Sequence, residues 1–346
     1  MDPLSPADPR DTGRVIAVLG AGSWGTALAL LLARTGSRVC LWTRDARSAA
    51  RLARDRENRR YLPGHAFPPR LGVETELEAA VERAGEVLLA VPSHAFREVI
   101  ARVAIAAPDD AGVAWATKGI DPASGRWLHE VVVDALGTAA RATVVSGPTF
   151  AGEVAAGLPA AVAVACADLD RARRVAGLLH GPRFRAYAND DVTGVSLGGA
   201  VKNVLAVAAG VADGLGLGAN TRAAIVSRGL GEMLRLGRIA GARDTTLMGL
   251  AGLGDLVLTC TDDQSRNRRF GLALAAGDTP DEARGRVGGV VEGATTAPLL
   301  FALAERFGIE MPITEQVAAV VGGEMTPAGA VETLLARAPT AEFEGE

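Results

Sequence analysis

The chain has 346 residues and a mass of 35.5 kDa, which is enough for two domains with sizeable cores. Its composition, 49% hydrophobic and 22% charged, is typical of a soluble globular protein, and a net charge of −4 excludes a global positive field for nucleic acid or anionic membranes. Three scattered cysteines show no metal-ligand spacing. They predict buried thiols in a reducing, cytoplasmic compartment, and we expect no metal site.

The N-terminal region combines a polar tail with a long uncharged run. Residues 1–13 are rich in proline and aspartate, which predicts a disordered tail. The run 15–33 carries no charge, but glycines lie at its centre and no basic region precedes it. A strand over 14–20, a glycine turn and an apolar helix up to residue 36 explain this run better than a membrane helix does. We therefore expect no stable membrane insertion.

The turn after the first strand reads GAGSWG and fits the pattern G-x-G-x-x-G with Gly20, Gly22 and Gly25. These glycines permit a tight turn, let the backbone approach a pyrophosphate and allow close packing of helix on strand. The phosphates would then lie on the N-terminal amides of the helix. Because the motif lies between a strand and a helix, it predicts dinucleotide binding.

A second strand is predicted over 38–43, and the residues at its end bear on the choice of cofactor. An NAD site usually places an acidic residue there, which accepts a hydrogen bond from the ribose 2′-hydroxyl. Here Thr43 and Arg44 occupy that point, and an arginine can pair with a 2′-phosphate. NADPH/NADP is therefore the preferred cofactor. The alternative cofactor is NADH/NAD. In that case Arg44 is a solvated loop residue and Asp45 binds the ribose.

The rest of the first half predicts a sheet covered on both faces. Apolar runs that alternate with helical stretches indicate an α/β fold with a Rossmann-type, doubly wound, mainly parallel sheet over residues 14–191. The prolines within 58–72 predict an irregular excursion. The further predicted strands are 86–92, 112–117, 142–147 and 159–166.

Ligands of such sheets bind beyond the carboxyl ends of the strands. Lys118 follows one predicted strand, and Gly147 and Thr149 follow the next, so we expect all three to face a ligand. His94 follows another strand, and we expect it to cap a helix or line the cofactor cleft. The alternative for Lys118 is a surface lysine in a turn.

After about residue 190 the pattern changes to long stretches rich in alanine, leucine and glycine at helical spacing. They predict an all-helical domain over 192–340, followed by a tail at 341–346. Lys202 stands in the apolar run LGGAVKNVLAVAAGVADG, where it either reaches the surface or serves chemistry. Gly198 and Gly199 would let this helix approach substrate and nicotinamide closely.

Three groups of polar residues stand out in this domain. They are Lys202 with Asn203, Asp255 with Thr259, and the stretch 265–267. If residues 255–259 are helical, Asp255 and Thr259 share one face. Ser265, Arg266 and Asn267 combine a planar cation with neutral donors and suit a phosphate dianion. The alternative for the last group is a solvated basic face.

Together these motifs resemble the bacterial NAD(P)-dependent glycerol-3-phosphate dehydrogenases. The matching segments run in order from about residue 14 to 315, and the longest is the most specific. They read GAGSWGTALA, VPSHAF, WATKG, SGPTFAGEVAAGLPAAVAVA, GGAVKNVLAVAAGVADGLGLGAN, GLAGLGDLVLTCTDDQSRNRRFG, VVEG and MPITE.

The resemblance implies reduction of dihydroxyacetone phosphate to sn-glycerol 3-phosphate by hydride transfer from NAD(P)H, for glycerophospholipid biosynthesis. The implied general acid/base is Lys202, and the catalytic group also takes in Lys118, Asp255, Asn203 and Thr259. The implied substrate contacts are Lys118, Gly147, Thr149, Lys202, Asp255, Ser265, Arg266 and Asn267. The implied cofactor contacts are Gly20, Gly22, Ser23, Trp24, Gly25, Arg44, Lys118, Ala151, Arg266, Val290 and Glu292.

The chemistry also follows from the residues. Reduction of a ketone places negative charge on the carbonyl oxygen, and a positioned ammonium can stabilise that charge and deliver the proton. Burial and a nearby Lys118 should lower the pKa of Lys202, whereas Asp255 should raise it. Two alternatives stay open: a related dehydrogenase of a β-hydroxyacid or sugar phosphate, and a non-catalytic nucleotide-binding protein. Helical domains of this kind often dimerise, so a homodimer is one candidate state.

Overall fold

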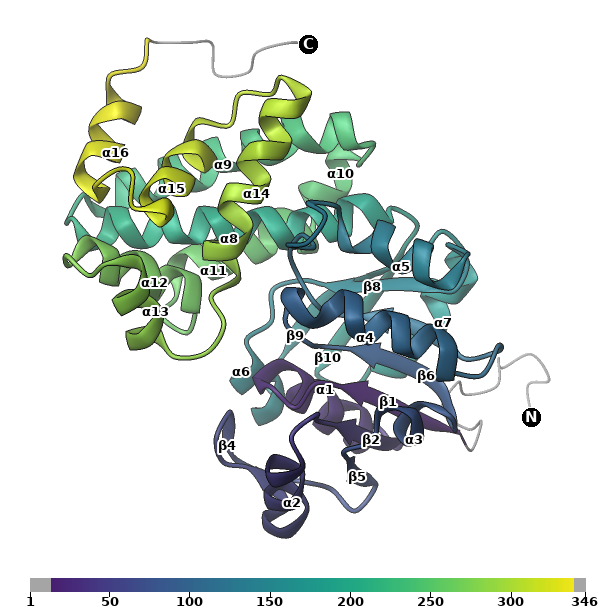
Figure 1. The fold of residues 1–346 in the computed structure, drawn as a ribbon. Helices are drawn as coiled ribbons and strands as arrows, with labels where there is room; N and C mark the ends of the chain where they lie inside the picture. The colour runs from purple at the N-terminus through teal and green to yellow at the C-terminus, as the bar shows by residue number, and fades with distance from the viewer. Residues whose placement is uncertain (1–13, 339–346) are drawn as a thin grey trace. The chain divides into compact units, whose positions relative to one another are not determined.

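An eight-stranded sheet organises the first part of the chain in this computed structural model, which describes residues 14–338 (Figure 1). The tails predicted at 1–13 and 341–346 lie outside the described residues. The chain divides into two compact units. Unit 1 comprises Met1–Thr117 and His129–Val192, and unit 2 comprises Lys118–Leu128 and Thr193–Glu346.

The sheet of unit 1 has the order β10-β9-β8-β7-β6-β1-β2-β5. From β5 to β8 this is the strand order of a doubly wound dinucleotide-binding sheet, with its switch point between β1 and β6. All pairings are parallel except that of β8 with β9. The strands are β1 Val15–Leu19, β2 Arg38–Trp42, β5 Leu71–Glu74, β6 Ala84–Leu89, β7 Gly112–Trp115, β8 Ala142–Ser146, β9 Ala160–Ala165 and β10 Phe184–Asn189.

Helices cover both faces of this sheet, as expected for strands that are apolar on both sides (Figure 1). Helix α1 packs beside α6 and α7, and α3 packs beside α4. The helices begin and end at α1 Ser23–Arg34, α2 Ala46–Asp55, α3 Leu77–Val81, α4 Ser93–Ala106, α5 Leu128–Leu136, α6 Ala151–Ala156 and α7 Leu169–Leu179.

The predicted irregular excursion over 58–72 is wrong in part. Two short strands, β3 Glu57–Asn58 and β4 Leu62–Ala66, pair antiparallel there, and the end of the segment enters β5 of the main sheet. Pro68 and Pro69 lie between β4 and β5, where no ladder hydrogen bond is needed from them. Strand β10 was also not predicted, because only one of its six residues is buried.

Unit 2 is helical and is built around α8 Val192–Gly214. Its other elements are α9 Gly218–Ala240, α10 Asp244–Leu247, the π-helical turn η1 Leu250–Gly254, α11 Asp255–Thr261, α12 Arg266–Ala275, α13 Pro280–Val287, α14 Glu292–Phe307, α15 Pro312–Gly322 and α16 Pro327–Leu335.

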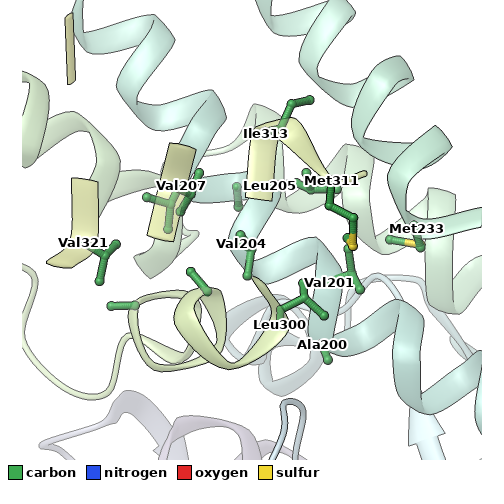
Figure 2. Close-up of a cluster of buried hydrophobic side chains, with 14 of the residues drawn as sticks. Ala200, Val201, Val204, Leu205, Val207, Met233, Leu300, Met311, Ile313 and Val321 are labelled. Atoms are coloured by element: carbon green, nitrogen blue, oxygen red, sulfur yellow. The ribbon is translucent and has the colours of Figure 1, made fainter. Parts of the chain in front are cut away.

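Helix α8 is apolar on all sides because other helices surround it. Figure 2 shows Val201, Val204 and Leu205 of α8 among Leu300 of α14 and Met311 beside α15. Within residues 14–338 it is the single helix long and apolar enough to cross a membrane, and its most apolar window is 100% buried within the protein. A helix buried in this way is typical of a protein core.

Candidate active site

The glycine motif of unit 1 forms the tight turn that the sequence predicted. Gly20 has φ +116°, and a Cβ there would lie 2.7 Å from the carbonyl oxygen of Ala90 at the end of β6. A Cβ at Gly25 would lie 3.2 Å from the Cβ of Ala90. At Gly22, in contrast, no atom lies within 4 Å, so the turn is open on that side. The three glycines therefore combine close packing with a concave surface of backbone.

The open side of this turn fits a dinucleotide pyrophosphate. Helix α1 begins immediately after Gly22 without a side-chain cap and without an acidic residue in its first turn. Its first amides, at Ser23 and Trp24, therefore keep the positive end of the helix dipole for an anion. Backbone N–H groups, an open glycine and no competing carboxylate are the donor set that a phosphate requires.

Asn58 supports the same turn, and sequence reasoning missed it. Its buried side-chain amide donates to the carbonyl oxygen of Ala21 across 3.0 Å and to Oγ1 of Thr26 across 2.8 Å. Ser23 donates to the carbonyl oxygen of Tyr61 across 2.8 Å. The β3–β4 segment thus fixes the backbone of the glycine turn. An asparagine in a segment read as irregular gave no signal of this contact.

At the end of β2 the structure distinguishes Arg44 from Asp45. Asp45 is the N-cap of α2, and its carboxylate accepts from the amides of Arg47 and Ser48 across 3.3 and 3.0 Å. The hydroxyl of Ser48 also donates to Asp45 and, as the largest effect, lowers the pKa of that carboxyl. Arg44 is exposed just before the cap. Both oxygens of Asp45 are therefore engaged within its own helix.

The other predicted contacts of unit 1 lie after its strands. A Cβ at Gly147 would lie 2.9 Å from the carbonyl oxygen of Ala161, so the close approach of β8 and β9 requires this glycine. Thr149 donates its hydroxyl to the carbonyl oxygen of Gly147 across 3.2 Å. Ala151 begins α6, and His94 is exposed in the first turn of α4.

Unit 2 brings Lys118, Asp255 and Lys202 together. Nζ of Lys118 donates to Oδ2 of Asp255, and Nζ of Lys202 lies 3.2 Å from Oδ1 of the same carboxylate. Lys202 also donates to the hydroxyl of Thr259 across 2.8 Å, and that hydroxyl donates to Asp255 across 3.2 Å. Asp255 and Thr259 share one face of α11, as the sequence predicted. One carboxylate thus bridges two ammonium groups.

Burial and the neighbouring charges together set the pKa values of Lys202 and Asp255. Lys202 is 8% exposed and Asp255 1% exposed. Burial is the largest effect and lowers the pKa of Lys202, Asp255 opposes this shift and Lys118 adds to it, and the net pKa is about 8. Burial alone would raise the pKa of Asp255, but the two lysines outweigh it and hold that pKa below its usual value. The predicted directions for Lys202 are confirmed.

A π-helical turn presents Asp255 to the lysines. Element η1 ends at Gly254, so the widened turn sets the direction in which Asp255 leaves the backbone. Gly198 of α8 packs on this turn, and a Cβ there would lie 2.6 Å from the carbonyl oxygen of Ala251. The expectation that Gly198 leaves room for substrate or nicotinamide is therefore corrected, because the space beside it is filled by η1.

The residues predicted to bind the substrate phosphate lie at the start of α12. Ser265 is the N-cap, so its hydroxyl accepts from the amide of Arg268. Arg266 is exposed, and its guanidinium lies against Gly289. Asn267 is buried and donates to Oδ1 of Asn203 on α8 across 2.8 Å.

Of the predicted cofactor contacts, Val290 follows Gly289 directly and Glu292 begins α14. Asn267 accepts from the amide of Gly293 across 2.9 Å, which ties the start of α12 to the start of α14. Arg266, Asn267 and the segment 289–293 therefore form one cluster within unit 2.

One signal in the sequence was overlooked. Lys118 and Lys202 are the only lysines among 346 residues, and every other basic side chain except histidine is arginine. Lysine changes its pKa readily when buried, whereas arginine stays charged. Both lysines of this chain thus meet one buried carboxylate, that of Asp255.

A dinucleotide-binding sheet and a buried lysine–aspartate–lysine cluster in one chain define an NAD(P)-dependent oxidoreductase. Models of the N-terminus and C-terminus of NAD-dependent glycerol-3-phosphate dehydrogenase match residues 15–172 and 191–332. The chain therefore belongs to the NAD-dependent glycerol-3-phosphate dehydrogenase family.

Individual relatives agree with the family. A protein of Xanthomonas euvesicatoria named glycerol-3-phosphate dehydrogenase (NAD(P)+) is 56% identical over 328 residues, covering 95% of this chain and 96% of the relative. One of the same name from Stenotrophomonas maltophilia is 54% identical and covers 96% and 97%. The crystal structure of glycerol-3-phosphate dehydrogenase from Coxiella burnetii has a TM-score of 0.90 and 48% identity, covering 94% of this chain and 99% of that one.

Proposed function

We propose that this chain catalyses the reversible, NAD(P)-dependent interconversion of dihydroxyacetone phosphate and sn-glycerol 3-phosphate. The observation that carries the proposal is the buried cluster in which Asp255 bridges Lys118 and Lys202. It provides a titratable proton donor for a carbonyl oxygen, beside side chains suited to a phosphate. Membership of the family supports the substrate class. We further propose that the product serves glycerophospholipid synthesis.

Lys202 acts as the general acid in reduction. The bound nicotinamide supplies the hydride. As charge develops on the carbonyl oxygen, the Lys202 ammonium stabilises it and transfers a proton, and in the reverse direction the neutral amine accepts that proton. A pKa of about 8 leaves both protonation states accessible near neutrality. Asp255 and Thr259 hold the ammonium in place, and Lys118 adds a second positive charge.

The phosphate of the substrate is bound by Ser265, Arg266 and Asn267. An exposed guanidinium offers a charged fork, and the amide of Asn267 is held in one orientation by Gly293 and Asn203. Binding the phosphate away from the reacting carbon orients the small ketone. Gly147 and Thr149 remain predicted substrate contacts.

The cofactor is held by unit 1 through the glycine turn, and NADP(H) is preferred. Asp45 already accepts three hydrogen bonds as the cap of α2, which leaves Arg44 as the side chain for the 2′-phosphate. The further cofactor contacts are Gly20, Gly22, Ser23, Trp24, Gly25, Lys118, Ala151, Arg266, Val290 and Glu292. We propose residues 14–191 as the cofactor domain and 192–340 as the substrate domain, with the segment Lys118–Leu128 of the first range grouping with unit 2.

The proposal also covers the cellular location and the oligomeric state of the protein. All three cysteines are free thiols, which is typical of a reducing compartment and supports a cytoplasmic location. Ile239, Met248 and Val257 are 54%, 51% and 42% exposed on the α9–α11 part of unit 2, which supports a homodimer. Sedimentation equilibrium measures the mass in solution, and a monomer at all concentrations contradicts the dimer.

The activity is tested by following cofactor absorbance with dihydroxyacetone phosphate, using NADPH and NADH side by side. We expect oxidation with both cofactors, a higher kcat/KM with NADPH, and sn-glycerol 3-phosphate as the product. Dihydroxyacetone without phosphate and a sugar phosphate serve as comparison substrates. Faster turnover of a sugar phosphate or a β-ketoacid contradicts the proposed substrate.

A further inference from the structure

Helices α8 and α12 run in parallel and contact each other along about three turns of α8. On α8 the contacting positions are 203, 207, 210 and 214, which share one face at helical spacing. On α12 they include Asn267, Gly271 and Ala275, each four residues after the last. Lys202 thus lies at one end of the contact on α8, and the proposed phosphate-binding residues begin α12.

Glycines set the separation of the two helices. A Cβ at Gly210 would lie 3.0 Å from Cα of Gly271, and a Cβ at Gly271 would lie 2.8 Å from the amide nitrogen of Val211. Both obstacles are backbone atoms, which cannot rotate away. A side chain of any size at either position therefore forces the helices apart.

Polar contacts fix the register along the same line. At one end, Asn203 accepts from Asn267 across 2.8 Å and donates to the carbonyl oxygen of Gly199 across 3.2 Å. Near the C-terminal end of α8, Asp213 pairs with Arg268, which follows Asn267 in α12, across 2.6 Å. Both side chains of this pair are about nine-tenths buried, and Arg222 of α9 also pairs with Asp213 across 2.8 Å. Asn203 is thus a positioning residue, engaged at both ends of its amide by protein.

We propose that this α8–α12 contact fixes the distance between the proton donor and the phosphate-binding residues, and thereby selects substrates with one carbon between carbonyl and phosphate ester oxygen. Gly210, Gly271, Asp213 and Arg268 are its positioning residues. The proposal rests on the proposed function, because it takes Lys202 as proton donor and Arg266 with Asn267 as phosphate contacts. Displacement of reacting groups by about 1 Å can cost about 10²-fold in rate.

The test compares three ketones with saturating NADPH: dihydroxyacetone phosphate, unphosphorylated dihydroxyacetone, and erythrulose 4-phosphate, which has one more carbon before the phosphate. For Gly271→Ala we expect kcat/KM for dihydroxyacetone phosphate to fall about 10- to 100-fold. The value for dihydroxyacetone stays within about twofold, because Lys202, Asp255 and Thr259 are not moved. The preference for the four-carbon phosphate over the three-carbon one rises.

The matched control is Gly285→Ala on α13, where a Cβ meets no atom within 4 Å, and it should behave as wild type. If circular dichroism shows that Gly271→Ala does not fold, Asp213→Asn is tested in its place. It keeps the shape of the side chain but removes the charge that pairs with Arg268, and we expect the same result. An equal loss on all three ketones in folded protein, or no loss on any, overturns the proposal. Wild-type protein inactive on dihydroxyacetone phosphate would instead contradict the proposed function itself.

Discussion

The ammonium nitrogen of Lys202 lies 3.2 Å from Oδ1 of Asp255 in the interior of unit 2. Burial favours loss of the lysine proton, while the carboxylate favours keeping it, and the two effects leave the pKa of Lys202 at about 8. A group that releases and regains a proton near neutrality is what reversible ketone reduction needs.

Replacing Lys202 by alanine should abolish turnover while leaving the cofactor in place. We expect kcat to fall by about 10²–10⁴-fold, the usual contribution of a general acid. The Kd for NADPH, measured by its fluorescence, should stay within about twofold, because the glycine turn belongs to unit 1. Lys202→Arg keeps the charge but cannot titrate, so it should be nearly as slow. Retention of more than about a tenth of kcat would exclude Lys202 from proton transfer.

The pH profile should report the same lysine. In the direction of ketone reduction, kcat/KM should be flat at lower pH and fall above about pH 8, as the Lys202 ammonium loses its proton. Asp255 raises the pKa of Lys202, so Asp255→Asn should move the falling limb to lower pH. Asp281→Asn, at an exposed carboxylate on α13, is the control. If the falling limb of the pH profile does not move in Asp255→Asn, that limb arises from a group other than Lys202.

Cofactor preference should depend on Arg44 and not on Asp45. Arg44→Ala is expected to raise KM for NADPH more than KM for NADH, because only NADPH carries the 2′-phosphate. Arg47→Ala, at an exposed arginine two residues after Asp45, serves as the matched control. An equal loss with both cofactors would contradict the assignment of Arg44.

The companion change is Asp45→Ala. It removes the cap of α2 and should lower the free energy of unfolding, with little effect on kcat/KM for NADH. Denaturant unfolding measures the first quantity and steady-state kinetics the second. A selective loss of NADH use would show instead that Asp45 binds the ribose.

Glu232 should make the stability of unit 2 depend on pH. This 1% exposed carboxylate on α9 accepts from the amides of Ile313 and Thr314 across 2.6 and 3.1 Å. Burial raises its pKa to about 7, against which these hydrogen bonds act. Because the folded pKa lies above the unfolded value, the fold favours the protonated acid. Stability should therefore be lost as pH rises from about 4.5 through 7, by about 3 kcal/mol at most.

Denaturant unfolding at several pH values measures this slope. Glu232→Gln should flatten it, while Glu315→Gln, at an exposed carboxylate in the first turn of α15, should leave it unchanged. An unchanged slope in Glu232→Gln would place the pH dependence elsewhere.

Much of the fold could be predicted because its central strands are uniformly apolar. Strands such as β1 and β6 are almost entirely buried, so their sequences are unbroken apolar runs. The family, the α/β fold class and the use of NAD(P) were predicted and are confirmed. The edge strands β5 and β10 were missed because exposure on their free sides admits glycine, arginine and asparagine.

The site was less accessible to sequence reasoning than the fold. No local sequence pattern predicts that Lys118 contacts Asp255, which lies 137 residues away. Only the resemblance to a known family suggested that both residues belong to one site. The support of the glycine turn by Asn58 and of Asn267 by Asn203 are long-range hydrogen bonds of the same kind. The π-helical turn before Asp255 was read as glycine-rich helix, since no periodicity distinguishes one widened turn.

The scarcity of lysine has a practical consequence. Both lysine side chains of the chain donate to Asp255, so any signal specific for a lysine side chain arises from this site. Uniform incorporation of ¹⁵N-labelled lysine would give two side-chain resonances against an otherwise silent background of arginine. Their chemical shifts, followed against pH, would reveal the protonation of the two ammonium groups separately in the unmodified enzyme. With two lysines in the chain, isotope labelling therefore reports directly on the cluster around Asp255.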